Sequence, residues 1–154
     1  MLCYFLGSNL QNAFCQTALP QLFAPGIIST EFMETSAAFT PDGKTVYFTR
    51  ADFAFSDNTI MESHFKGSKW QEPEVASFSG VWRDSEPHVS PDGTKLFFVS
   101  NRPVNPGDKP LLANFSGRSF PGANIWFVEK KGKGWGEPIH INGAVNAVPT
   151  VYNP

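Results

Sequence analysis

The sequence is short of cysteine, of clustered basic residues and of long apolar runs, and each shortage excludes a class of protein. Two cysteines, Cys3 and Cys15, cannot build a disulfide framework. Twelve basic residues against 14 acidic ones leave no basic stripe, so no nucleic-acid partner is expected. No apolar run approaches the roughly 20 residues of a membrane helix, so no transmembrane segment is predicted.

Catalytic and metal-binding motifs are missing as well. The chain contains no G-x-S-x-G nucleophile elbow, no H-E-x-x-H, no C-x-x-C and no P-loop. His64, His88 and His140 fall on three different predicted strands, without the clustering that metal ligands show. We therefore expect no catalytic residue, no metal and no cofactor.

The first residues have features of a secretory signal. An apolar stretch at 2–6 is followed by a small-x-small sequence that ends at Cys15, the form of a signal-peptidase site. The stretch is short and no Lys or Arg precedes it, as in a signal whose start is truncated. The pattern predicts a signal peptide at 1–15, export to the periplasm or cell envelope, and a lead-in segment at 16–35. An ordinary frayed N-terminus is the alternative.

Aromatic and turn-forming residues are what the chain has in abundance. Aromatics make up 14% of the residues, and there are 13 glycines and 13 prolines. This composition favours short strands joined by many turns.

An internal repeat organises these strands. Residues 39–48 match 89–98 at an offset of 50, and both contain a Thr/Ser-Pro-Asp-Gly unit. Residues 67–73 match 132–138 at an offset of 65. In each unit the proline presets φ, the aspartate binds nearby backbone amides and the glycine adopts positive φ. The structural turn residues are therefore Pro41, Asp42, Gly43, Pro91, Asp92 and Gly93.

Each repeat is interpreted as a four-stranded blade of a β-propeller. Consecutive apolar positions, as at 46–48 and 96–99, indicate strands buried on both faces by neighbouring blades. The expected fold is all-β, a partial β-propeller of two four-stranded antiparallel blades plus the first strand of a third. Strands A to D are expected at 36–40, 45–50, 59–65 and 69–76, and again at 86–90, 95–100, 124–129 and 134–140. Blade 1 then spans 36–76, blade 2 spans 77–140 with a long B–C loop at 101–123, and blade 3 starts in 141–154.

The repeat resembles the TolB-type propeller family, relatives of the WD40 repeat marked by a Pro-Asp-Gly hairpin. The resemblance covers 26–154 and is carried by 40–43, 90–93, 98–102, 125–128 and 134–138. That family includes periplasmic binding proteins, envelope scaffolds and the gating propellers of some peptidases, so the resemblance implies the fold more than the function. Such propellers close with about six or seven blades. We therefore expect this chain to be a fragment, or to complete a propeller by self-association.

The two ends of such a blade differ in charge. The A–B and C–D turns share one end, here the plain end; the B–C and D–A connections share the other, here the loop end. Seven of the eight lysines belong to plain-end turns, whereas all four arginines fall at the loop end or its edge. An arginine fork suits a carboxylate or phosphate, although pairing with a neighbouring carboxylate is the commoner use. The candidate ligand-binding or partner-binding residues are Trp82, Arg83, Asp84, Arg102 and Arg118.

Two functions remain open at this point. The first is a non-catalytic exported binding or scaffold module that holds a protein partner or a polar or anionic ligand at the loop end. The second is a piece of a larger exported enzyme, such as a peptidase gating propeller or a glycan-active propeller. Trp70 and Trp135 occupy equivalent positions and are expected to pack between blades, whereas Trp82 is the candidate exposed contact.

Overall fold

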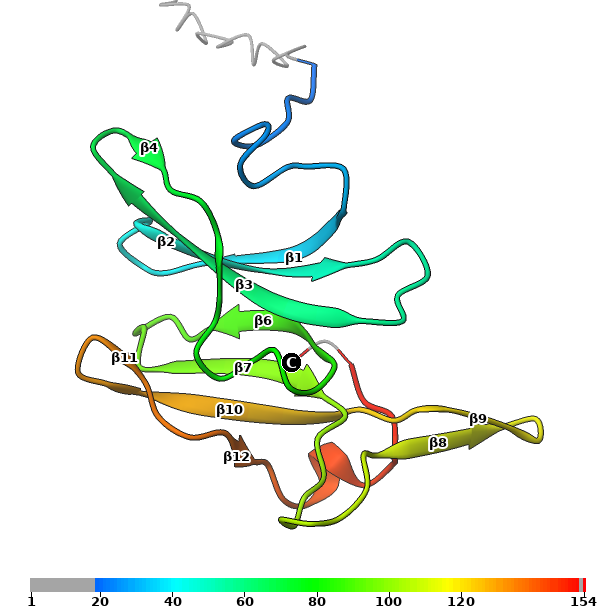
Figure 1. Ribbon diagram of the computed structural model, residues 1–154. Coiled ribbons are helices and arrows are strands. Elements are labelled where there is room, and N and C mark those ends of the chain that lie inside the picture. The colour runs from blue at the N-terminus through cyan, green and yellow to red at the C-terminus, as the bar shows by residue number, and fades with distance from the viewer. Residues whose placement is uncertain (1–18, 153) are drawn as a thin grey trace, which may run out of the picture.

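The computed structural model describes residues 19–152 and residue 154, and Figure 1 shows two antiparallel sheets, one above the other. The fold is all-β and has the form of a partial β-propeller, as the repeat predicted. Both cysteines and the predicted signal peptide at 1–15 lie outside the described residues.

Blade 1 is the upper sheet of Figure 1, and its strands lie side by side in sequence order. Its central pair joins β2 and β3 from Thr45↔His64 to Ala51↔Asn58. The strands are β1 (Met33–Phe39), β2 (Thr45–Ala51), β3 (Asn58–Lys66), β4 (Lys69–Trp70) and β5 (Glu74–Val75).

Blade 2 repeats this arrangement below it. β7 lies between β6 and β10, and β10 also pairs with β11 and β12. The strands are β6 (Asp84–Val89), β7 (Lys95–Ser100), β10 (Asn124–Lys131), β11 (Gly134–Trp135) and β12 (Ile139–His140). The expected strands A, B and C of both blades agree with the observed ones to within three residues.

The fourth strand of each blade is divided into two short pieces, β4 and β5 or β11 and β12. Pro73 and Pro138 lie between the pieces. Because proline has no backbone N–H, it interrupts the ladder that a continuous strand would make.

The long B–C connection of blade 2 contains a hairpin that the sequence analysis treated as loop. It consists of β8 (Leu112–Phe115) and β9 (Arg118–Pro121) and projects from the body at the right of Figure 1. Ser116 and Gly117 have φ of 49° and 76°, and two successive positive φ values are the geometry of a type I′ turn.

The segment expected to begin blade 3 forms no named strand in residues 149–152 and 154. Thr150 makes an isolated parallel bridge with Ala123, and Pro154 lies in a hollow with Ser36 and His88, beside β1 and β6. The chain therefore returns to the first strands of both blades.

The main core lies between the two sheets. Tyr47 and Ile60 of blade 1 pack with Leu96, Phe98 and other buried residues of blade 2. A second core covers the opposite face of blade 1. Its buried residues are Ile28, Val46, Phe48 and Met61. β2 is therefore buried on both faces, as its consecutive apolar residues predicted.

Both blades contain the same irregularity in their first strand. β1 has a bulge between Thr35 and Ala38, and β6 has one between Ser85 and His88. The bulged residues Ser36 and Glu86 are 50 positions apart and both have φ of 54°. In β6 the bulge frees the Glu86 N–H to donate to Thr49 Oγ1 of blade 1, at 2.9 Å.

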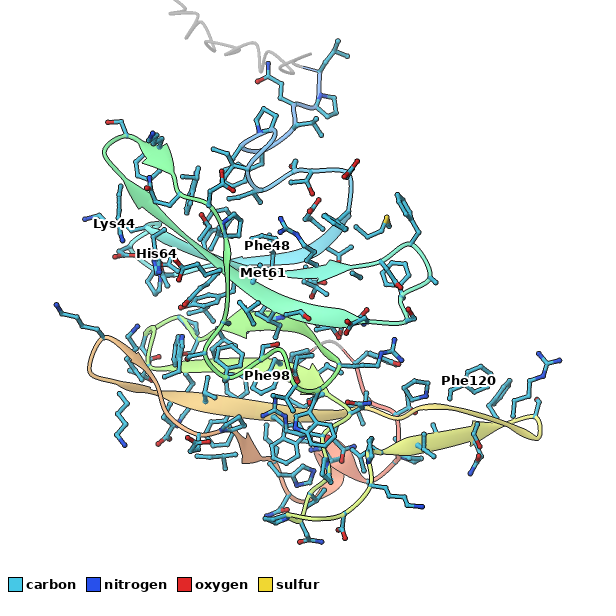
Figure 2. All side chains as sticks on the ribbon, in the orientation of Figure 1. Lys44, Phe48, Met61, His64, Phe98 and Phe120 are labelled. Carbon is cyan, nitrogen blue, oxygen red and sulfur yellow. The ribbon has the colours of Figure 1, made fainter. Side chains whose placement is uncertain are left out.

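The two ends of the blades are separated as the strand order requires. In Figure 1 the β3–β4 and β10–β11 hairpins lie at the left, while the β2–β3 connection and the β8–β9 hairpin lie at the right. Figure 2 shows Lys44 and His64 at the left, which is the plain end, and Phe120 at the right, which is the loop end.

Candidate functional site

Two of the hollows at the loop end are formed by equivalent positions of the repeat, one in each blade. Hollow 2, in blade 2, has a volume of about 420 Å³; its lining consists of Trp82, Arg102, Pro103, Val104, Pro106, Gly107, Asp108, Trp126 and Pro138. Hollow 1, in blade 1, has a volume of about 290 Å³; its lining consists of Phe32, Arg50, Ala51, Asp52, Asp57, Thr59, Met61 and Val75.

Arg102 holds the frame of hollow 2 together. It lies two residues after β7 and is buried. Its Nη2 donates to Asp84 Oδ1 at 2.8 Å and to the Phe78 carbonyl at 3.0 Å, and its Nε donates to Ser100 Oγ at 2.8 Å. The side chain therefore ties the end of β7 to the start of β6 and to the connection between the blades.

Aromatic rings fix the plane of the same guanidinium. Arg102 Cζ lies 4.9 Å from the centroid of Phe98 and 5.5 Å from that of Trp126. Cation–π contacts of this length are attractive, and more so when water is excluded. These contacts restrict the orientation of the Arg102 guanidinium in the wall of hollow 2.

Asp84 supports the wall of hollow 2 through its ion pair with Arg102. Its side chain is fully buried, and Ser79 Oγ donates to its Oδ2 at 2.9 Å. Burial raises the pKa of the Asp84 carboxyl above its ordinary value, while the Arg102 guanidinium and the hydroxyls of Ser100 and Ser79 oppose that rise. Asp84 acts on the hollow through Arg102 and does not line it.

The two tryptophans supply the remaining chemistry of hollow 2. Trp82 is half-buried and stands two residues before β6. Trp126 comes from β10, and its Nε1 is buried without a hydrogen-bond partner. An unsatisfied buried donor costs about 1–3 kcal/mol.

Hollow 1 is built from equivalent positions of the repeat. Phe32 stands 50 residues before Trp82, and Met61 stands 65 residues before Trp126. Arg50 Nε binds Glu34 Oε1 at 3.1 Å, and its Cζ lies 5.6 Å from the Phe32 ring. The two blades thus contain the same ion pair: a carboxylate at or near the start of the first strand binds an arginine near or just after the end of the second strand.

The comparisons with known proteins decide nothing further about identity. No family model and no curated protein matches the chain. Across residues 19–152 and 154, no three His, Cys, Asp or Glu side chains are grouped as metal ligands would be. No helix in that part of the chain is long and apolar enough to cross a membrane.

The five candidate binding residues are only partly brought together. Trp82 and Arg102 line hollow 2, and Asp84 lies behind Arg102. Arg83 instead donates through Nη2 to the Phe55 carbonyl, which links the β5–β6 connection to the β2–β3 connection. Arg118 is exposed on β9 and does not line hollow 2.

Sequence reasoning missed hollow 1. Its signal was present, because Phe32 and Glu34 precede Trp82 and Asp84 by the same 50 residues that separate the two Pro-Asp-Gly turns. The signal was hidden by Arg50 and Arg102, which are 52 residues apart and so do not align in the repeat.

The Pro-Asp-Gly turns lie at the opposite end and have a closed network of their own. Asp92 Oδ1 accepts hydrogen bonds from Ser90 Oγ at 2.6 Å and from the Thr94 N–H at 3.0 Å. These bonds lower the pKa of Asp92 to about 2, and Thr40 and Lys44 lower the pKa of Asp42 in the same way. Gly43 and Gly93 have φ of 66° and 69°.

Proposed function

We propose that the chain is a non-catalytic binding module, a partial propeller of TolB type, that holds a polypeptide segment of a partner protein at its loop end. The observation that carries the proposal is hollow 2, which is lined by the fixed guanidinium of Arg102 and by the indoles of Trp82 and Trp126. A concave, mostly apolar site with a few fixed polar groups is the usual form of a binding site.

The residues that line hollow 2 favour binding over catalysis. They include no serine, cysteine, histidine or lysine that could serve as a nucleophile or a base. Arg102 is already engaged with Asp84, and Asp108 Oδ2 accepts a hydrogen bond from Asn105. The charged groups therefore stabilise the wall, and the aromatic and proline side chains provide the contact area.

The surroundings of hollow 2 favour a polypeptide partner. Val104 lines the hollow and is exposed, and Val81, the residue before Trp82, is exposed as well. Exposed apolar residues that surround an aromatic pocket are typical of protein-interaction sites. An apolar side chain of the partner would fill hollow 2 and contact Trp82 and Trp126 in its wall.

The test is selection of binding peptides from a random displayed library, with the full chain as target. Selected peptides should bind the Trp82→Ala variant at least about 30-fold more weakly, because hot-spot tryptophans contribute about 2 kcal/mol or more. Phe65→Ala, which removes an exposed aromatic side chain at the plain end, is the matched control and should leave affinity unchanged. Peptides whose affinity does not depend on Trp82 would refute the proposed site.

The proposal includes export to the cell envelope, which rests on the signal-like sequence at 1–15. It also includes the TolB-type relationship, which rests on the repeated Pro-Asp-Gly hairpins and on the all-β fold of two equivalent blades.

A further inference from the structure

A cluster of four aromatic side chains lies at the plain end of blade 1, away from both hollows. Phe23, Phe39 and Phe65 surround Trp70, with ring centroids 5.4 Å, 6.0 Å and 5.4 Å from that of Trp70. Phe23 and Phe39 are in edge-to-face contact at 5.6 Å. The cluster joins the segment before β1 to the β3–β4 hairpin.

The cluster is open to solvent. Phe23, Phe39 and Phe65 are 43%, 46% and 41% exposed, and Leu19 and Leu22, which precede Phe23, are 84% and 74% exposed. Single exposed apolar residues are ordinary, but contiguous exposed apolar patches mark sites that bind another protein or a membrane.

Lysines lie at the same end of the molecule as this cluster. Lys44 is joined to it directly, since its carbonyl accepts from the Phe65 N–H at 2.8 Å, and Lys66 and Lys69 form the tip of the same hairpin. The plain-end turns of blade 2 add Lys95, Lys130, Lys131 and Lys133. Figure 2 shows Lys44 and His64 together at this end.

Few carboxylates oppose these lysines. The four turns at 40–45, 65–70, 90–95 and 129–135 contain seven lysines and three acidic residues. Asp42 and Asp92 are hydrogen-bonded within their own turns, and Glu129 is paired with Lys95. These four turns therefore carry a net positive charge beside an exposed aromatic patch, and the exposed Glu72 and Glu137 lie two residues beyond the turns at 65–70 and 129–135.

We propose that the plain end docks on an anionic lipid bilayer, with the lysines against the headgroups and the Phe23–Phe39–Phe65–Trp70 cluster in the interfacial layer. Aromatic rings prefer the membrane interface, and basic residues are attracted to anionic lipid. The lysines are spread over four turns of two blades. A binding partner with an extended anionic surface matches this spread better than a single acidic side chain does. The proposal is independent of hollow 2.

Flotation of the full chain with lipid vesicles tests this. The chain should bind vesicles that contain phosphatidylglycerol, bind pure phosphatidylcholine vesicles much more weakly, and dissociate at high salt, because salt screens exposed charges. Each lysine near the surface should contribute about fivefold, so Lys66→Gln with Lys69→Gln should weaken binding about 25-fold. Lys109→Gln and Phe53→Ala, changes at the loop end, are the matched controls and should have no effect.

Quenching of tryptophan fluorescence by brominated lipid locates the contact. Trp70→Phe should lose most of the quenching, whereas Trp82→Phe should be quenched as strongly as the unaltered chain. Circular dichroism and thermal unfolding establish that each variant is folded. The proposal is overturned if anionic vesicles do not bind, if the Lys109 control weakens binding as much as the Lys66–Lys69 pair, or if the chain binds polyglutamate but no vesicle.

Discussion

At the scale of single residues, two ion pairs at equivalent places differ in how deeply they are buried. The Asp84 side chain has no exposed surface and that of Arg102 is 9% exposed, whereas the Glu34 and Arg50 side chains are 12% and 22% exposed. Removing one partner of a buried pair leaves a charge without compensation, and that penalty far exceeds the value of a surface pair. The two blades therefore allow the same substitution to be compared in two environments.

Asp84→Asn should lower the free energy of unfolding by about 3 kcal/mol, because the Arg102 charge stays buried without its counter-charge. Glu34→Gln should lower it by about 1 kcal/mol, because Arg50 retains contact with solvent. Urea unfolding followed by circular dichroism measures both. Equal losses in the two variants would show that burial does not set the strength of these pairs.

At the scale of elements, the two Pro-Asp-Gly hairpins have one geometry but different neighbours. A Cβ on Gly43 would meet no heavy atom within 4 Å, whereas a Cβ on Gly93 would lie 3.2 Å from Pro41 Cδ. The turn of blade 1 thus packs on the turn of blade 2, and the second glycine is needed for space as well as for its positive φ.

Gly43→Ala should destabilise the fold by about 1 kcal/mol, the cost of placing a side chain at positive φ. Gly93→Ala should cost more, because the added methyl group also displaces Pro41. Chemical denaturation of the two variants gives the difference. A Gly93 variant that is no less stable than the Gly43 variant would mean that the two turns do not press on each other.

The same scale shows what the sequence could and could not predict. Turn chemistry and consecutive apolar residues located the strands from 45–51 and 95–100 almost to the residue, because both signals are local. The bulges at Ser36 and Glu86 had no such signal, since neither residue favours positive φ. The bulge at Glu86 accompanies packing between blades, because its N–H donates to Thr49 of blade 1.

The candidate site was predictable only in part, for a related reason. Trp82 and Arg102 stood out by residue type and by their place in loop-end connections. The partnership of Arg102 with Asp84, the shape of hollow 2 and the existence of hollow 1 depend on how the chain folds back across two strands. Contacts of that kind leave little trace in a single sequence.

At the scale of the whole molecule, one contact links the outer part of blade 2 to the core of blade 1. Trp135 Nε1 donates to Tyr47 Oη at 2.9 Å, and the two rings are 6.0 Å apart in an edge-to-face arrangement. Trp135 therefore packs between blades, as expected, and Trp70 occupies the equivalent place against Phe23 of the segment before β1. Burial raises the pKa of Tyr47 above 10, its ordinary value, and a nearby Glu62 contributes to the rise.

The Tyr47 pKa predicts alkaline instability. Above pH 10 the unfolded chain releases the Tyr47 proton while the folded chain keeps it, so the free energy of unfolding should fall as pH rises. Tyr47→Phe should flatten that fall, whereas Tyr152→Phe, which alters an exposed tyrosine, should not. Urea midpoints measured from neutral pH upward give the slopes, and identical slopes for all three chains would contradict the assignment.

The segment before β1 makes the two outer faces of the paired sheets different. Ile28, with Ala24 and Ile27, packs on the Val46 and Phe48 face of blade 1, which corresponds to the face that blade 2 turns toward blade 1. This segment covers the outer face of blade 1, whereas on the outer face of blade 2 the ring centroids of Phe97 and Phe127 are 5.9 Å apart. A further sheet would therefore pack on blade 2. To close the sheets into a ring, a sheet that packs on blade 1 would have to displace residues 24–28. Ring closure would therefore replace one apolar contact of blade 1 with another.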